Sequence, residues 1–378
     1  MPGWELVGES ERAMVDSIFG DKGGVAFAHG FAALRDVYHV RELEFEVAGW
    51  AGVVHCQAVS SGSAGLFCAL KAAGTGPGDE VITSCFTFVA TVEAILLTGA
   101  NPICVDIDKS LNMDLEAARD ALSSRTKAVI PVHMCGKALD VNALITAVTR
   151  EDGTRPVIIE DACQAMGALT PDDRLAGTVG DIGVYSLDAG KVIQCGEGGL
   201  VVTNSLELYE RVRAVHDHGH TYDNPDRAAE SPRMVGFNFR MTELQAAYAR
   251  AQLKRLPTIL ETQRENLALL MDLPNGENIR DAGDSLVLFF ESPEYVQRLV
   301  PILRQRKIGV KNVPDALNWH FARNWEHIFP DARFRWPRSA DILSRAVVIP
   351  IPATSQGPSW RDSLYLALAQ ARLAEVSE

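Results

Sequence analysis

The chain has 378 residues, which at about 150 residues per domain suggests two or three domains. Its 36 basic and 49 acidic residues give a formal net charge of -13. Because the averaged field of such a chain repels polyanions, we expect no nucleic-acid partner and no anionic-membrane partner, whereas a small anion can still be bound locally. The hydrophobic fraction of 47% and the charged fraction of 22% are typical of a globular protein with a sizeable core.

The sequence indicates neither a membrane span nor a secretion signal. No apolar stretch approaches the ~18–20 residues that cross a bilayer. Residues 1–20 carry Glu5, Glu9, Glu11 and Asp16 and no uninterrupted apolar segment. Seven cysteines without a CxxC spacing are typical of reduced thiols and indicate no zinc or redox motif. We therefore expect a cytoplasmic protein with no membrane association.

Strands and helices are predicted to alternate between residues 58 and 203. Strands are expected at Glu80–Thr83, Pro102–Asp106, Ala128–Val132, Val157–Glu160, Gly183–Ser186 and Gly199–Thr203, and helices at Ser63–Ala73, Thr87–Leu97, Leu115–Ser123 and Val141–Thr149. The strands are short, β-branched and apolar on both faces, as strands covered by helices on each side are. This pattern predicts an α/β fold built on a mostly parallel sheet.

After residue 203 the pattern changes to longer helices and fewer strands. Helices are expected at Leu206–Val215, Thr242–Leu256, Glu261–Met271 and Tyr295–Arg306, a strand at Ser285–Phe290 and a surface loop at Gly219–Pro232. We predict a large domain over residues 1–257, with an N-terminal arm at 1–20, and a small α+β domain over residues 258–378.

Three segments of the predicted large domain carry residues that suit chemistry. The first is Ser60-Ser61-Gly62-Ser63-Ala64, which opens a predicted helix. A turn of small residues at a helix N-terminus exposes backbone N–H groups that suit a phosphate. Taken alone, the segment is explained better by a tight turn in which Ser63 is the N-cap.

The second segment, Ile158-Ile159-Glu160-Asp161, is a buried strand that ends in acids. A carboxylate at the end of an α/β strand often faces a ligand crevice, where Asp161 could bond a protonated heterocyclic nitrogen. A helix N-cap or a carboxylate that binds magnesium would fit equally well.

The third segment places Lys191 between an apolar strand with its turn, Tyr185–Gly190, and a glycine-dense turn, Gly196–Gly199. A lysine in such a turn is usually only solvated. Desolvation and neighbouring cations would lower the pKa of its amine and make it a nucleophile for Schiff-base formation.

Together with Gly236–Ala247, these segments resemble the DegT/DnrJ/EryC1/StrS family of aminotransferases, which depend on pyridoxal 5'-phosphate and act mainly on sugars. The matching motifs are Val59–Ala64, Gly76–Ile82, Phe86–Thr91, Glu160–Ala165, Gly196–Gly199 and Asn238–Ala247. The resemblance runs from Trp4–Gly8 to about Leu256 and more loosely beyond. It implies the aspartate-aminotransferase-like fold (type I), with a large, mostly parallel mixed sheet between helices and a smaller C-terminal α+β domain.

The resemblance also implies catalytic roles. Lys191 is expected to hold the cofactor as the internal aldimine and, once released, to move a proton between the substrate Cα and the cofactor C4′. Asp161 is expected to keep the pyridine nitrogen protonated, which makes the ring an electron sink. Gln164 would bond the ring hydroxyl, and Phe88 would stack on the ring.

The phosphate is expected in a cup made by Gly62, Ser63, Ala64 and Ser186. The resemblance implies that Asn238 completes this cup from the neighbouring subunit, and therefore that the protein is a homodimer with shared active sites. The implied substrates are an amino-acid donor, glutamate or glutamine, and a sugar acceptor.

The sequence departs from the family pattern in two places. Leu187 and Asp188 stand where Phe and often His are usual, so Asp188 could alter the preference for substrate charge or point away. Residues 314–327 are more similar to the subgroup that aminates C8 of the eight-carbon acid sugar Kdo. Their aromatic residues, among them Trp319 and His320, could line a substrate pocket or fill the core.

Other residues leave alternatives open. His216, His218 and His220 would share one face of a strand, but the segment follows a helix, so we expect no metal there. Arg240 could bind a substrate carboxylate or form an interface salt bridge. Alternative functions are a sugar dehydratase on the same scaffold, whose members commonly replace the lysine with histidine, and a non-catalytic regulatory homologue. The lack of an early GxGxxG disfavours a nicotinamide dehydrogenase.

Overall fold

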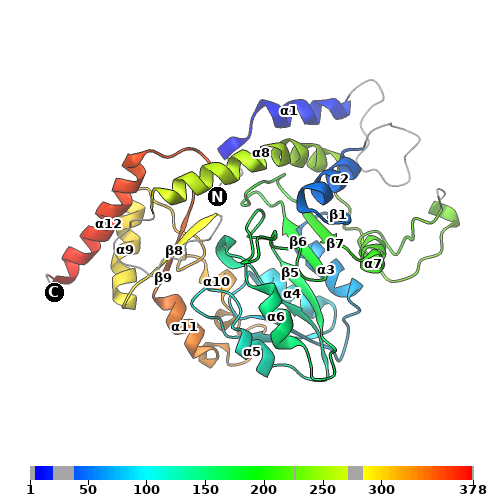
Figure 1. The fold of residues 1–378 in the computed structure, drawn as a ribbon, viewed down its shortest axis with the longest axis horizontal. Coiled ribbons are helices and arrows are strands. Elements are labelled where there is room, and N and C mark those ends of the chain that lie inside the picture. Colours follow the sequence, from blue (N-terminus) through cyan, green and yellow to red (C-terminus); the bar gives the residue numbers. More distant parts are fainter. Residues whose placement is uncertain (1–4, 20–37, 225–226, 271–283, 377–378) are drawn as a thin grey trace.

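The computed structural model describes residues 5–19, 38–224, 227–270 and 284–376. Parts of the predicted N-terminal arm (residues 1–4 and 20) and the end of the helix predicted at Glu261–Met271 lie outside the described residues. A seven-stranded sheet forms the centre of the structure, in the order β1-β7-β6-β5-β4-β2-β3 (Figure 1). Its strands are β1 (His55–Val59), β2 (Glu80–Ser84), β3 (Asn101–Val105), β4 (Thr126–Ile130), β5 (Val157–Asp161), β6 (Ile182–Ser186) and β7 (Gly199–Thr203).

Most neighbouring strands of this sheet run parallel. Strands β3, β2, β4, β5 and β6 pair in parallel, while β7 is antiparallel to both β6 and β1. The predicted α/β fold with a mostly parallel mixed sheet is therefore confirmed.

Helices cover both faces of the sheet. The helices of the described residues, including those that pack on a second, C-terminal sheet, are α1 (Glu9–Asp16), α2 (His39–Ala51), α3 (Gly62–Ala72), α4 (Val89–Leu97), α5 (Leu115–Asp120), α6 (Val141–Val148), α7 (Leu206–His216), α8 (Glu243–Ala268), α9 (Pro293–Gln305), α10 (Leu317–His320), α11 (Pro337–Ser344) and α12 (Pro358–Val376). In the described part of the chain, none of them combines the length and the apolar composition that a membrane span requires.

The side chains of consecutive strand residues pack in different hydrophobic clusters, because they point alternately to the two faces of the sheet. In β6, Val184 packs in the cluster that includes residues of α3, α4 and α7, whereas Tyr185 packs in the cluster that includes residues of α2 and α8. Both side chains are fully buried. This is the burial on both faces that the sequence pattern predicted.

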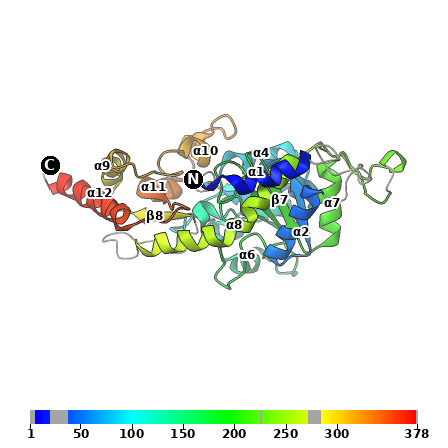
Figure 2. The same ribbon diagram turned by 90° about the horizontal axis from the view of Figure 1, so that it is seen from above.

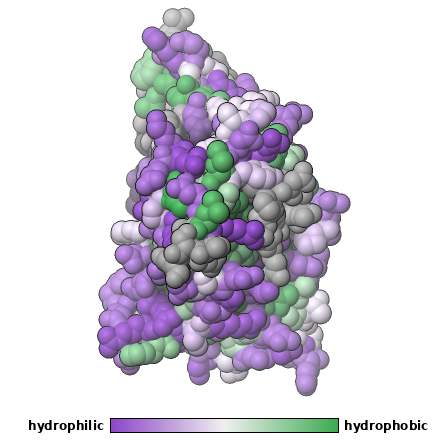
Figure 3. All heavy atoms as spheres, turned by 90° about the vertical axis from the view of Figure 1, so that its left-hand side faces the viewer, coloured by the Kyte–Doolittle hydropathy of each residue, from purple (hydrophilic) through white to green (hydrophobic). Residues whose placement is uncertain are grey.

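A second sheet lies in the C-terminal part of the chain. Strands β8 (Ser285–Phe289) and β9 (Ala346–Pro350) form an antiparallel pair. Leu286 and Leu288 pack with buried residues of α9 and α12, whereas Val287, which points to the other face, packs with the core of the large sheet. The surface that carries α9 and α12 is mainly hydrophilic, with hydrophobic residues confined to small patches (Figure 3).

The sequence prediction was wrong about the helices near residue 257. Instead of two helices, α8 runs without interruption from Glu243 to Ala268, and Pro257 lies inside it. Proline removes a single N–H donor, and buried neighbours such as Leu256 and Ile259 hold the helix on both sides of it. Figures 1 and 2 show α8 running from the large sheet to the β8–β9 pair. The predicted domain boundary at 257/258 falls inside this helix, and the division into two domains stays a prediction.

Candidate functional site

A cavity of about 700 Å³ opens where the parallel strands β5 and β6 end. Ligand sites of α/β sheets lie at this edge, beyond the carboxyl ends of the strands. Seven of the nine predicted site residues line the cavity: Gly62, Ser63, Phe88, Asp161, Gln164, Ser186 and Lys191. The opposite wall comes from the C-terminal part of the chain and includes Asp284, Gly309, Val310, Lys311, Asn312, Asp315 and His320.

The N-terminus of α3 forms one end of the cavity. The N-cap is Ser61 and not Ser63, because the Ser61 hydroxyl accepts the Ala64 N–H at 3.1 Å. Gly62 and Ser63 therefore supply the first N–H groups of the helix, which have no partner within it. A Cβ on Gly62 would lie 2.9 Å from Ser186 Cβ and 3.0 Å from Cys163 Sγ. Glycine thus lets the helix N-terminus approach the end of β6.

Asp161 is the last residue of β5 and is buried at the cavity wall. Its carboxylate accepts the Thr91 hydroxyl at 2.8 Å and the Cys163 N–H at 3.1 Å. Thr91 itself is held by Thr87 through a hydroxyl contact of 2.7 Å. The carboxylate is therefore fixed in one orientation. Thr91 lies in a motif that the sequence analysis quoted, but no role was predicted for it.

Asp161 and its neighbour Glu160 point to opposite faces of β5. Glu160 bonds His133 at 2.8 Å and accepts the N–H groups of Gly177 and Gly180 on the other side of the sheet. Burial alone would raise the pKa of Glu160, but His133 and these amides hold it below its usual value. Glu160 is thus a structural carboxylate, and only Asp161 faces the cavity.

Lys191 lies in a closed turn between β6 and β7. Leu187 N–H donates to the Gly198 carbonyl at 2.8 Å, and Ala189 N–H donates to the Gly196 carbonyl at 3.0 Å. Inside the turn, Asp188 accepts the Gly190 N–H at 2.9 Å through its side chain. Asp188 therefore shapes the loop that presents the half-buried Lys191 to the cavity.

Gln164 and Phe88 face the cavity and contact the C-terminal wall. Gln164 accepts a hydrogen bond of 2.9 Å from the Asn312 side chain. The Phe88 ring lies 5.3 Å from the ring of His320, at an angle of 52°. Burial lowers the pKa of His320, and the nearby charges of Lys191 and Lys311 lower it further. Because Asn312 is 148 residues from Gln164, no local sequence signal could have revealed this contact.

Two predicted residues, both within the described part of the chain, do not line the cavity. Ala64 is buried, and its N–H is used by the Ser61 cap, so it cannot contribute that N–H to a phosphate. Asn238 is exposed, and its backbone forms an isolated antiparallel β-bridge with Asp217 outside this cavity. The predicted role of Asn238 in a second subunit is not contradicted by this position and stays a prediction.

The other charged candidates have structural partners. Arg240 donates to the buried Asp217 and does not line the cavity. His216 ends α7 and is buried, which lowers its pKa to about 4. His220 bonds Glu230 at 2.7 Å. Across the described residues, no three His, Cys, Asp or Glu side chains are grouped so that they could hold a metal ion.

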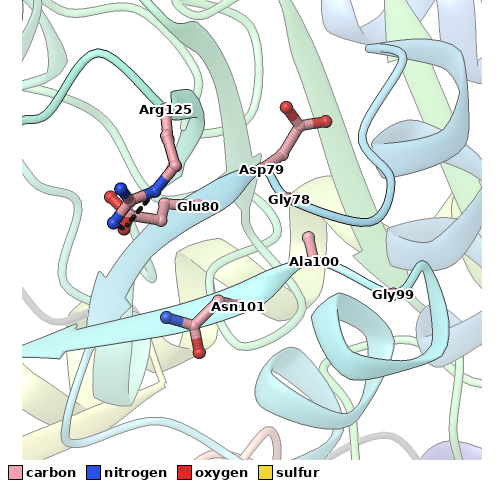
Figure 4. A pocket seen from close by; sticks show the side chains of 7 residues that line it. All are labelled: Gly78, Asp79, Glu80, Gly99, Ala100, Asn101 and Arg125. Atoms are coloured by element: carbon pink, nitrogen blue, oxygen red, sulfur yellow. Dashed lines mark hydrogen bonds and ion pairs between the residues drawn. The ribbon is translucent and has the colours of Figure 1, made fainter.

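A second hollow lies at the amino-terminal ends of the parallel strands β2 and β3, opposite the ends that face the large cavity (Figure 4). Its main polar feature is Glu80, which accepts the Ser123 hydroxyl at 2.5 Å and the Arg125 Nε–H at 3.0 Å. The Ser123 hydrogen bond and the Arg125 guanidinium keep the pKa of Glu80 low. We interpret this as a paired structural carboxylate at the end remote from Lys191.

The donor set of the large cavity suits pyridoxal phosphate. Lys191 offers a primary amine, Asp161 a fixed carboxylate, and Gln164 an amide. The N-terminus of α3 can hold a phosphate, with the hydroxyls of Ser63 and Ser186 beside it. These groups match the aldehyde, ring nitrogen, ring hydroxyl and phosphate of that cofactor, and the cavity volume is typical of a small-molecule site.

Comparison with known proteins gives matches over most of the chain. The profile of the DegT/DnrJ/EryC1/StrS aminotransferase family matches residues 32–356. The chain is 40% identical over 239 residues to the spore coat polysaccharide biosynthesis protein SpsC of Bacillus subtilis, a match that covers 61% of this chain and 59% of that protein. It is 39% identical over 228 residues to a UDP-N-acetyl-3-dehydro-alpha-D-glucosamine 3-aminotransferase of Acidithiobacillus ferrooxidans, covering 59% and 58%.

These two matches each span less than two thirds of the relative's length. Among solved structures, 3-amino-5-hydroxybenzoic acid synthase superimposes with a TM-score of 0.83 at 26% identity, over 99% of this chain and 98% of that chain.

Proposed function

The chain belongs to the DegT/DnrJ/EryC1/StrS aminotransferase family, and we propose that it transfers an amino group from glutamate or glutamine to a keto- or aldehyde-sugar. Its cofactor is pyridoxal phosphate, as in this family and in solved relatives of the same fold. The observation that carries the proposal is that Lys191, Asp161 and the N-terminus of α3 line one cavity.

When bound, pyridoxal phosphate supplies an electron sink that stabilises negative charge at the substrate carbon that carries the amino group. Asp161 would hold the proton on the ring nitrogen, and Thr91 and the Cys163 N–H fix its carboxylate for that contact. Because the Asp161 carboxylate is buried and oriented, its ion pair with the protonated ring nitrogen would need little rearrangement during the reaction.

Lys191 would act twice in this proposal. Its amine would hold the cofactor covalently at rest and, once released by the amino donor, would carry the proton from the substrate Cα to the cofactor C4′. The closed turn that begins at Leu187 and Asp188 keeps the amine within reach of the cavity. The first N–H groups of α3, with Ser63 and Ser186, would hold the phosphate.

The proposal includes a homodimer in which Asn238 of the partner subunit completes the phosphate site. The exposed position of Asn238, away from the cavity of its own chain, supports this arrangement. So do the exposed side chains of Val235 and Phe237 beside it. The cytoplasmic location and the likeness of residues 314–327 to the Kdo-aminating subgroup remain part of the proposal.

A sugar dehydratase on this scaffold is the second candidate, and two solved structures of the same fold bear that name. Lys191 favours the aminotransferase, because its amine could take up a proton in the cavity and, as the ammonium, give it back. A regulatory homologue would bind the same cofactor without turnover, so a turnover assay separates it from both enzymes.

The test is a pair of half-reactions followed by absorbance of the holoenzyme. Glutamate or glutamine should bleach the visible band, and an accepting sugar should restore it. The acceptor panel should contain a nucleotide-linked keto-sugar, a free acid sugar and a cyclitol ketone. We expect Asp161→Asn to retain cofactor but to react at least a hundredfold more slowly. If no amino acid bleached the visible band while the cofactor was fully bound, the proposal that the protein is an aminotransferase would be refuted.

A further inference from the structure

Asn312 contacts the predicted cofactor site from the C-terminal wall of the cavity. Its side-chain Nδ2 donates to Gln164 Oε1 at 2.9 Å, and the residue is buried. Its φ of 62° lies in the left-handed region, which asparagine adopts more readily than most residues. The backbone conformation and the side-chain contact thus both favour asparagine at this position.

The segment around Asn312 is held on both sides. The Lys311 N–H donates to the Val348 carbonyl at 2.8 Å, and the Ala316 N–H donates to the Asn312 carbonyl at 2.9 Å. Further along, the Thr87 N–H donates to the His320 carbonyl at 2.9 Å. The Asn312 side chain is therefore presented to Gln164 from a fixed backbone.

The direction of the hydrogen bond determines which end of the Gln164 amide is left over. A glutamine side chain has one carbonyl acceptor and one NH₂ donor. Because Asn312 donates, it occupies the Gln164 carbonyl, and within the described residues no protein group accepts from the Gln164 NH₂. Since Gln164 lines the cavity, the NH₂ is the end available to a ligand there.

We infer that Asn312 is a positioning residue: it holds Gln164 so that the Gln164 NH₂ is offered to the oxygen of the ring hydroxyl of pyridoxal phosphate. The inference rests on the proposed function and adds a residue to it. An N–H donor stabilises that oxygen in its ionised form. Without the Gln164 N–H donor, the ionised oxygen is less stable. The group that joins Lys191 to the bound cofactor, which gives the visible band, should therefore keep its proton to a higher pH.

The experiment is a spectrophotometric pH titration of the visible band of the holoenzyme. Asn312→Gly removes the side chain and tolerates the positive φ, so the variant should fold. Asn312→Asp keeps the shape but can only accept, so it should turn the Gln164 amide around. A hydrogen bond to a charged group is worth enough to move the midpoint upward by about one pH unit in each variant.

A double-mutant cycle shows whether Asn312 acts through Gln164. Gln164→Ala should raise the midpoint by itself, and adding Asn312→Gly should then shift it no further. The other titratable side chains that line this cavity are unchanged in every arm of the cycle: Asp161, Cys163, Asp188, Lys191, Glu197, Asp284, Lys311, Asp315 and His320. Asn324→Asp, an exposed position in the same segment that does not line the cavity, should leave the midpoint of the parent.

The outcomes separate the two proposals. A parent protein with no visible band after loading would overturn the proposed function, and this inference with it. A parent with a normal band whose midpoint is the same in Asn312→Gly would overturn only the role of Asn312. Equal shifts from Asn312→Gly with and without Gln164 would show a direct field effect and would also contradict the inference.

Discussion

Replacing Gly62 by alanine should close the phosphate end of the site. Gly62 is the first residue of α3 and lies directly against the end of β6. The added Cβ would stand 2.9 Å from Ser186 Cβ and 3.0 Å from Cys163 Sγ. Ordinary van der Waals contacts begin at 3.4 Å. The helix N-terminus must therefore move away from β6 by several tenths of an ångström.

The cost of this movement follows from the rigidity of both neighbours. Ser186 Cβ is attached to a buried strand, and Cys163 follows the end of β5, so neither can swing aside like the end of a long side chain. Overpacking of this kind costs about 1–3 kcal/mol. If the same displacement loosens the phosphate contacts, the cofactor affinity should fall by about tenfold to a hundredfold, at about 1.4 kcal/mol for each factor of ten.

The assay is a titration of the apoprotein with pyridoxal phosphate, combined with urea unfolding of each variant. Gly76→Ala is the matched control, because its Cβ would meet nothing within 4 Å. We expect it to keep the parent's affinity and stability. If Gly62→Ala bound the cofactor as tightly as Gly76→Ala does, the assignment of the α3 N-terminus to the phosphate would be refuted.

Three further predictions concern single groups. Thr91→Val removes a donor to the Asp161 carboxylate and should slow the donor half-reaction at least tenfold in single-turnover absorbance; an unchanged rate would contradict it. Asp284→Asn leaves the Lys311 ammonium, whose side chain is only 10% exposed, without its counter-charge and should lower the free energy of unfolding by about 3 kcal/mol in urea; a loss below 1 kcal/mol would be incompatible with a largely buried pair. The pKa of His216 is lowered to about 4 by burial, so between pH 6.5 and 4 only the unfolded chain takes up this proton, and the parent should lose about 3 kcal/mol of stability that His216→Gln keeps.

Two comparisons make these measurements specific. The exposed pair Arg333–Glu326 serves as the control for the buried pair, and Glu326→Gln should change stability by less than about 1 kcal/mol. For the pH series, Glu44 acts in the opposite sense, because burial raises its pKa to about 7 and the folded state holds its proton. The His216 contribution is therefore read from the difference between parent and variant and not from the parent curve. Identical pH profiles for the two proteins would exclude it.

The sequence was most informative where function and fold depend on local pattern. The strands from β2 to β7 were predicted within two residues at each end, because buried strands are continuous apolar runs between turn residues. Lys191, Asp161 and Gln164 were found from short motifs, since Asp161 ends β5 and the other two lie within five residues of a strand end, on the side of the sheet where ligands bind.

Features that depend on distant contacts were missed. Strand β1 and strand β9 were not predicted, and α8 was predicted as two separate helices, although packing on both sides of Pro257 keeps it continuous. The wall formed by Lys311 and Asn312 depends on how the C-terminal part packs on the large sheet. No periodicity or spacing in the sequence encodes that contact.

The most direct test of the central claim is to identify the lysine that holds the cofactor. Two lysines, Lys191 and Lys311, line the described part of the cavity, so the alternative is concrete. Borohydride reduction of the cofactor-loaded protein, followed by peptide mass spectrometry, should place one phosphopyridoxyl group on the peptide that contains Lys191. A label on Lys311, or a loaded protein that acquires no label, would contradict the account.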